Sequence, residues 1–429
     1  MAPTAIAAPE RTDGEYGEVT LELLGLLERD PRAKRALEQS IDAAASANSD
    51  PDTNPVRSLD DYYRFVDRTV DLVPRDVLEN PENLLRDEIQ QTICYFYFLV
   101  GQEVDALRGL EGYDLYRPAP MYYPPFSNWL RTYADAWGQF LDTEASWNRR
   151  IYREFYADER FGLQEDWYET PAAWDSFNDF FARHLRTPDV RPIASGDDVV
   201  SAPADSVPQG VWRIEDDLSL GDRVDPHAPN GGGGGGSGET DGDHGTESDG
   251  GVRIKNRSHQ TVSDLLGESD YADAFAGGRF THTFLNVNDY HRYHFPVSGV
   301  VREHDTFEQN VAIEAHWDGD AGRYGPVDTT GWQFTQTRGY VIVETDTVGV
   351  VALVPIGMAE VSDVYFADPV ESGRTFRKGD PLGHFLFGGS DFAMLFDSEA
   401  NFELTDAYDD DADQYEHLLM GEAYGHVDA

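Results

Sequence analysis

The sequence has little lysine, and its charge is dominated by one sign. Three lysines (Lys34, Lys255 and Lys378) and 30 arginines stand against 80 acidic residues, which gives a formal net charge of -47. The acidic residues occur along the whole length rather than in blocks, which is typical of a solvated acidic surface suited to a high-salt cytoplasm. This charge argues against a nucleic-acid partner, because its phosphates would be repelled.

The sequence also lacks cysteine pairs and long apolar runs. Its single cysteine, Cys94, excludes an internal disulfide and a multi-thiolate metal site. It lies in TICYFYFLVG, where we interpret it as a small buried hydrophobic residue. That run of roughly ten residues is too short for a bilayer, which requires about 20. The N-terminus lacks the pattern of a signal peptide, so we expect a cytoplasmic protein with at most peripheral membrane contact.

The chain of 429 residues divides into regions that differ in composition and in hydrophobic pattern. Residues 1–57 are acidic and are expected to be loosely ordered, and 58–170 show helical spacing of Trp and Tyr, with a candidate cap at Ser58. From residue 171 onward, short β-rich runs alternate with Gly and Pro. A Gly-rich insertion at 230–251 cannot pack a core and is predicted to be a disordered surface loop. The fold class is therefore α+β, with a helical N-terminal extension on a β-rich domain.

Four polar residues in the β-rich region invite a chemical interpretation. Asp205 follows a strand in SAPADS, His291 and His294 lie three apart in DYHRYHFPVSG, and Ser390 lies in FGGSDF. An Asp–His–Ser triad is one reading, but a lipase-type elbow requires Gly-x-Ser-x-Gly, which this segment lacks. Two metal ligands spaced HxxH are another, although a metal would need a third ligand, and we expect none. Ordinary polar strand residues are the third alternative.

Five ordered segments together resemble the phosphatidylserine decarboxylase family, over roughly residues 174–396. They are WDSFNDFFARHLRTPDVRPI, the PAD turn, VRIKNRSHQTVSDLLG, DYHRYHFPVSGVV and KGDPLGHFLFGGSDFAMLF. The upstream segment PMYYPPFSNWLRTYADAWGQFLDTEAS is similar to the extension of soluble relatives, some of which act on free aromatic amino acids such as tryptophan. A lone Gly-Ser would carry no weight, whereas five ordered motifs ending in it are highly specific.

The resemblance implies that the chain cuts its own backbone between Gly389 and Ser390. The Ser390 hydroxyl attacks the Gly389 carbonyl, and β-elimination and hydrolysis then turn residue 390 into a covalent pyruvoyl cofactor. By the same resemblance, His294 is the base for Ser390 and Asp205 orients it, while His291 returns a proton to the substrate after CO2 departs. Glycine suits position 389 because a residue without Cβ tolerates strained backbone and crowding.

The sequence departs from the family at Asp391, where Ser or Thr is usual. A carboxylate there would hydrogen-bond, hold an incoming ammonium, or hinder the elimination. An unprocessed, non-catalytic binding relative therefore stays open as an alternative.

The substrate is a further open question. A serine phospholipid headgroup, decarboxylated to its ethanolamine form in phospholipid biosynthesis, is the family default, and a free aromatic L-amino acid is the alternative. The expected partners are this substrate, the two processed fragments held together, and a second copy of the chain as an optional homodimer.

Overall fold

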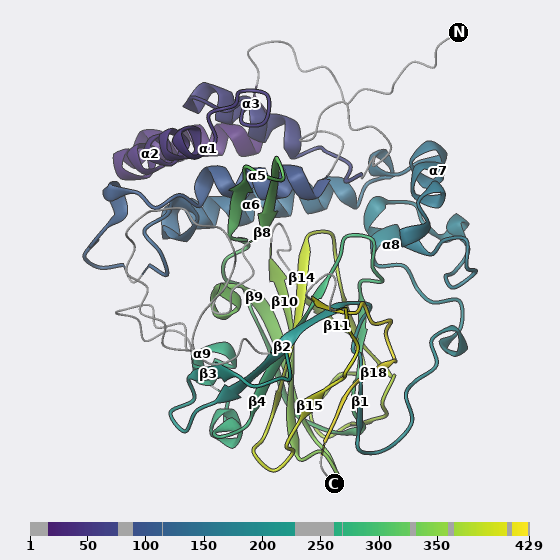
Figure 1. The fold of residues 1–429 in the computed structure, drawn as a ribbon. Helices are drawn as coiled ribbons and strands as arrows, with labels where there is room; N and C mark the ends of the chain where they lie inside the picture. Colours follow the sequence, from purple (N-terminus) through teal and green to yellow (C-terminus); the bar gives the residue numbers. More distant parts are fainter. Residues whose placement is uncertain are drawn as a thin grey trace.

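The computed structural model describes residues 16–75, 89–113, 115–227, 261–267, 269–326, 332–358, 364–409 and 414–427. Helices from the N-terminal part form a layer over one end of a β-rich body, so the α+β class is confirmed (Figure 1). The described helices are α1 (Glu18–Arg29), α2 (Pro31–Ala47), α3 (Leu59–Thr69), α5 (Ile89–Val100), α6 (Pro124–Leu141), α7 (Arg149–Ala157), α8 (Phe177–Phe181) and α9 (Val262–Leu265).

The helical layer is built around α5. Every residue of α5 whose burial is described is buried except Gln90, as expected for a helix that is apolar nearly all round. Cys94 lies inside this helix and is 2% exposed, which agrees with its reading as a small buried hydrophobic residue. The helix α3 begins where the sequence predicted, because the Ser58 side chain accepts a hydrogen bond from the Asp61 amide.

The first two helices are packed rather than loosely docked. On α1, Leu23 is 0% exposed, and on α2, Leu37 is 0% exposed. Both belong to the same apolar cluster as α5 and α6. Asp30 caps α2 by accepting from two backbone amides, so the turn between the helices is also fixed. Residues 18–47 therefore form an integral part of the helical layer, in contrast to the loose order expected for 1–57, because their apolar stripes are continuous.

The β-rich body contains an eight-stranded sheet in the order β12-β6-β9-β10-β14-β4-β2-β3, and its described pairings are antiparallel. Smaller sheets have the orders β11-β13-β5 and β1-β18-β15. The strands are β1 (Val199–Ser201), β2 (Val207–Ile214), β3 (Leu220–Arg223), β4 (Arg279–Leu285), β5 (Arg292–His294), β6 (Gly299–Phe307), β7 (Ala315–Asp318), β8 (Arg323–Pro326), β9 (Thr337–Glu344), β10 (Val350–Met358), β11 (Val364–Phe366), β12 (Thr375–Phe376), β13 (Pro381–Phe385), β14 (Gly389–Phe396), β15 (Glu403–Leu404), β16 (Tyr408–Asp409), β17 (Gln414–Tyr415) and β18 (Ala423–His426).

The strand β14 occupies the interior of the large sheet and is buried on both faces. It pairs with β10 from Gly389 to Phe396 and with β4 from Ser390 onward. Its side chains alternate: Phe392 and Met394 join one apolar cluster, while Ala393 and Leu395 join the cluster shared with the helices. Ser390 and Asp391, the first polar residues of the strand, therefore point to opposite faces.

Two further expectations concern the Gly-rich insertion and a membrane-spanning helix. The Gly-rich insertion at 230–251 lies outside the described residues. Among the described residues, no helix is both long and apolar enough to span a bilayer.

The packing of the first two helices can be tested by truncating one core side chain. Leu37→Ala should lower the free energy of unfolding by about 2–5 kcal/mol, because it removes a fully buried leucine and leaves a cavity. Denaturant titration of the full chain measures this difference. The matched control is Leu21→Ala on α1, whose side chain is 55% exposed and whose loss should cost less than about 0.5 kcal/mol. Equal, small costs for both variants would mean that these helices are docked loosely.

Candidate active site

The predicted cleavage bond lies at the start of β14. Ser390 is 0% exposed, sits opposite Leu285 of β4 and Gly357 of β10, and its hydroxyl has no hydrogen-bond partner among the described residues. Buried hydroxyls are nearly always bonded, so this one is notable. The unusual backbone lies one residue earlier than expected: Gly388 has φ +148°, a conformation open only to glycine, and Gly389 is not among the positive-φ glycines.

Both histidines lie beside the segment that leads to this bond. The strand β5 carries His294 and pairs with β13, and the His291 carbonyl accepts from the Phe385 amide at 2.9 Å. The chain then needs only residues 386–388 to reach the start of β14. Strand pairing therefore places His291 at Phe385 and His294 opposite Pro381, both on the strand that precedes the cleavage bond, although about 90 residues separate these partners in the sequence.

His294 is buried and held through both ring nitrogens. Its Nδ1 lies 2.9 Å from the Gly379 carbonyl, so Nδ1 carries the proton, and its Nε2 lies 3.1 Å from the Tyr290 hydroxyl. Burial lowers the pKa of His294 to about 4, against the Gly379 hydrogen bond, which raises it. The ring is therefore neutral near pH 7, with the Nε2 lone pair accepting from Tyr290.

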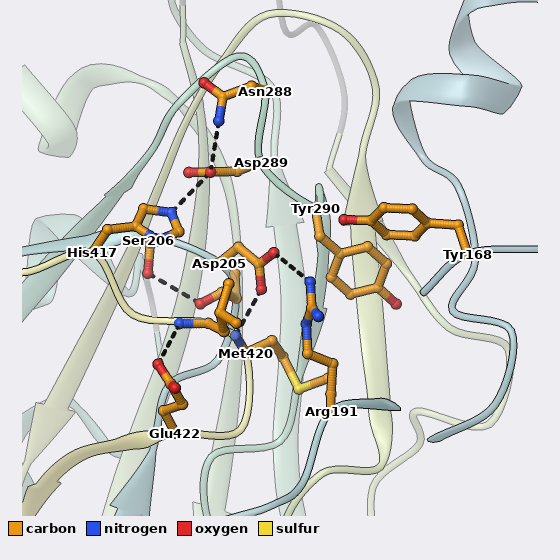
Figure 2. A network of polar contacts seen from close by, with 12 residues as sticks. Tyr168, Arg191, Asp205, Ser206, Asn288, Asp289, Tyr290, His417, Met420 and Glu422 are labelled. Carbon is orange, nitrogen blue, oxygen red and sulfur yellow. Dashed lines mark hydrogen bonds and ion pairs between the residues drawn. The ribbon is translucent and has the colours of Figure 1, made fainter. Parts of the chain in front are cut away.

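Asp205 contacts other groups than the sequence suggested. Its carboxylate pairs with Arg191 at 3.0 Å and accepts from the Met420 amide at 2.7 Å (Figure 2). Since both nitrogens of His294 are bonded elsewhere among the described residues, Asp205 does not orient this ring by accepting a hydrogen bond from it. Asp205 still acts on His294 through its charge, which raises the pKa of that ring.

His291 is the histidine with an open nitrogen. Its Nδ1 donates to the Asp289 carbonyl at 3.0 Å, and its ring stacks on Phe181 with centroids 3.8 Å apart. Its Nε2 has no partner among the described residues, although the side chain is buried. Burial, and then the charge of Arg183, lower the pKa of His291 well below its usual value. The ring is thus a neutral imidazole that presents an unused lone pair.

Asp289 connects this loop to the C-terminal segment. Its carboxylate is bonded to His417 at 2.8 Å and to the Asn286 amide at 2.7 Å, as Figure 2 shows for the histidine. Burial raises the pKa of Asp289. Burial would lower the pKa of His417, but the hydrogen bond and charge of Asp289 outweigh it, so the pKa of His417 is raised.

Asp391, where the sequence departs from the family, is part of a buried pair. One carboxylate oxygen lies 2.9 Å from His282 Nδ1, and both side chains are nearly inaccessible. The other oxygen has no partner within the described chain. The hydrogen-bonding option raised for this carboxylate is therefore realised, on the face of β14 opposite to Ser390.

Aromatic side chains from the helical layer cover the cleavage segment. The ring of Phe387, two residues before Gly389, is packed against Trp137 of α6 and against Phe177 and Phe181 of α8 at centroid distances of 5.4–5.6 Å. Asn178 accepts from the Phe387 amide at 3.3 Å. The extension is therefore in direct contact with the site.

Several of these residues were not singled out from sequence. Tyr290 and Asp289 lie inside the motif that carries the histidines, and Arg191 lies inside the motif opening at Trp174, so their motifs were a usable signal. His417 and His282 occur in unmarked strands and turns, and only the fold brings them to the site. Within the described part of the chain, no group of three His, Cys, Asp or Glu side chains is arranged to hold a metal ion.

The chain is similar in sequence to known proteins. The sequence model of phosphatidylserine decarboxylase matches residues 177–426, more than half of the chain. This chain belongs to the phosphatidylserine decarboxylase family. The matched region contains Asp205, both histidines and Ser390.

Individual relatives are distant. A phosphatidylserine decarboxylase proenzyme from Hamiltonella defensa is 30% identical over 39% of this chain and 46% of its own length, so the alignment spans about half of that relative. One from Chlamydia felis is 26% identical over 58% of this chain and 69% of its own length. Decarboxylase iboD from Amanita muscaria is 25% identical over 67% of this chain and 80% of its own length. That share exceeds the part of the chain after residue 176, so the last alignment reaches into the helical extension.

The pair formed by His417 and Asp289 makes stability depend on pH. A histidine whose folded pKa is raised contributes stability that is fully present below its unfolded pKa, about 6.5, and lost as the pH rises through the folded value. His417→Gln should therefore reduce the free energy of unfolding more at pH 6 than at pH 9, as measured by denaturant titration at constant salt.

The control is His426→Gln, which removes a histidine from an exposed pair with Glu403 at 3.4 Å. Exposed pairs contribute little, so this variant should change stability by a small amount at both pH values. A His417→Gln effect that is the same at pH 6 and pH 9 would contradict the raised pKa.

Proposed function

We propose that this protein is a pyruvoyl-dependent decarboxylase that cuts its own backbone between Gly389 and Ser390. The observation that carries the proposal is the buried, unpartnered hydroxyl of Ser390 at the start of β14, two residues after the unusual backbone of Gly388. The strand before it, β13, pairs with β5, which carries His294. A hydroxyl without a partner keeps its lone pairs available for attack on the preceding carbonyl. The residues at this position fit a pyruvoyl group, because the group would be made in place from residue 390.

His294 is proposed to take the proton from Ser390. Its neutral ring has Nδ1 fixed on Gly379, which leaves Nε2 as the accepting nitrogen. In the described structure the Tyr290 hydroxyl is hydrogen-bonded to that nitrogen. The proton from Ser390 therefore passes through the Tyr290 hydroxyl, or it reaches the ring after Tyr290 has moved away. Asp205 supports the step electrostatically, since its negative charge favours the protonated ring.

His291 is proposed to move protons during decarboxylation. A substrate amine arrives as an ammonium and must lose a proton before it can react with a ketone. The open Nε2 of the neutral His291 ring can hold that proton and return it to the α-carbon after CO2 departs. The pyruvoyl ketone supplies the electron acceptor that no amino-acid side chain provides.

The two fragments are expected to stay associated after the cut. The smaller fragment begins at residue 390 and contributes β14 to the interior of the large sheet, between β10 and β4. It also contributes β18, which pairs with β1 and β15. Separating the fragments would expose both ladders and the apolar faces of β14, which is costly.

Family membership and the structure support two different substrates. Membership favours a serine phospholipid, the substrate class in the family's name. The geometry favours a free amino acid, because helices cover the end of the sheet where the cleavage segment lies, and Trp137 packs on Phe387 (Figure 1). The net charge of -47 also opposes an anionic lipid surface. We infer that a free amino acid with an aromatic side chain suits a cleavage segment covered by helices better than a headgroup anchored in a bilayer.

Self-processing is tested by replacing the proposed nucleophile. The unmodified protein should give two fragments on intact-mass analysis, the smaller one blocked to Edman degradation and reactive with hydrazines. Ser390→Ala should give one chain near 48.0 kDa that releases no CO2. A single uncut species from the unmodified protein would instead favour a non-catalytic binding relative.

The comparison variant is His291→Ala, which should still be cut but release CO2 at least about a hundredfold more slowly, within the usual contribution of a general acid–base group. An uncut His291→Ala protein would show that the two histidines have exchanged roles.

The substrate is tested with the processed protein. Release of CO2 from tryptophan should exceed release from serine phospholipid vesicles, measured at equal substrate concentration in high salt. Vesicle flotation provides a second readout, and we expect the protein not to bind the vesicles. Faster turnover of the serine phospholipid would overturn the amino-acid assignment while leaving the reaction type intact.

A further inference from the structure

Arg183 is a fully buried cation beside the proposed proton carrier. The residue follows the short helix α8 and its side chain is 0% exposed. Its Nη2 donates to the carbonyls of Asn288 and Asp289, each at 3.0 Å. Among the described residues no carboxylate pairs with it. An unpaired buried guanidinium is costly, so its position calls for an explanation beyond packing.

Aromatic rings partly compensate this charge. The guanidinium carbon lies 4.4 Å from the ring centre of Tyr168 and 5.1 Å from that of Phe180. These are distances at which the face of a ring attracts a cation. The guanidinium is therefore held in one orientation by two rings and two carbonyl oxygens.

One of these carbonyls is shared with His291. The Asp289 oxygen accepts from Arg183 at 3.0 Å and from His291 Nδ1 at 3.0 Å. Two residues before Arg183, Phe181 stacks on the same imidazole at 3.8 Å. Phe181 thus supports the face of the His291 ring, and Arg183 holds the Asp289 carbonyl oxygen that fixes the His291 tautomer.

We propose that Arg183 is a positioning residue for His291, which clamps the carbonyl that orients the imidazole and keeps a fixed positive charge beside it, so that Nε2 stays unprotonated until substrate arrives. This inference rests on the proposed role of His291 in decarboxylation. Arg183 acts on His291 through the carbonyl oxygen of Asp289, which both side chains share, rather than through a hydrogen bond to the imidazole itself.

The charges around His291 support this assignment. Arg183 is the charged side chain that acts on its pKa, and the direction is downward. Asp289 reaches the ring through its carbonyl, while its carboxylate is bonded to His417 and the Asn286 amide. Phe181, an apolar side chain, stacks on the face of the ring.

The test uses Arg183→Met and Arg183→Lys in the full chain. Intact mass first establishes that each variant is processed. For Arg183→Met, the acidic limb of the pH profile of kcat/KM should move upward by about 1 pH unit, because a neighbouring positive charge has been removed. Its kcat should fall roughly ten- to a hundredfold with little change in KM, since a small misplacement of a proton carrier slows the chemical step.

The lysine variant separates charge from geometry. Arg183→Lys keeps the positive charge, so the acidic limb should stay where it is in the unmodified protein, while kcat falls because an ammonium cannot bridge the two carbonyls as a guanidinium does. If Arg183→Met does not fold, the lysine variant carries the test, and a full kcat in it would overturn the proposal.

The matched control is Arg338→Met. Arg338 is also buried, bonded to the carbonyls of Leu265 and Asp264, and packed over the Phe307 ring at 5.1 Å. Its removal should destabilise the protein without moving the acidic limb. An equal shift in this variant, or no shift in Arg183→Met, would overturn the assignment.

A readout that does not depend on turnover is the titration of the His291 ring by NMR, assigned by its loss in His291→Ala. The ring should titrate at higher pH in Arg183→Met than in the unmodified protein. If the unmodified protein releases no CO2, the proposed function fails, whereas this titration still decides whether Arg183 controls His291.

Discussion

Backbone pairing of β14 with a strand on each side is the interaction on which the site depends. The ladder to β10 runs from Gly389 to Phe396, and the ladder to β4 begins at Ser390. The first paired residues of the strand are thus the two that flank the proposed cut. A serine held by two ladders has little freedom, so the proposed attack on the preceding carbonyl depends on the backbone before it, where Gly388 has a φ of +148°.

The second constraint is electrostatic. The segment 286–294 carries two histidines whose pKa is lowered by burial, so both rings are neutral near pH 7. Around His294 the charge of Arg292 lowers the pKa while the charge of Asp205 raises it, whereas Arg183 lowers the pKa of His291. The two rings also differ in their Nε2 atoms, because that of His294 is bonded to Tyr290 and that of His291 has no partner among the described residues.

Much of this could be predicted from sequence, because local patterns carry it. The cap at Ser58, the burial of Cys94 and the α+β class follow from side-chain chemistry and period. The partner of Asp205 could not be predicted, since it depends on where the loop with Arg191 folds back. The tight docking of α1 and α2 was also missed, because the surfaces of α5 and α6 that cover their apolar stripes come from a later part of the sequence.

The C-terminal segment has a consequence for any change to the end of this chain. The Met420 amide donates a hydrogen bond to Asp205, and the ring of His417 is bonded to Asp289. One short stretch after residue 414 therefore contacts both carboxylates. Shortening the protein by its last dozen residues would leave the large sheet untouched and remove one of these two contacts. Progressive deletion from this side would therefore release Asp205 before Asp289, because Met420 is lost before His417.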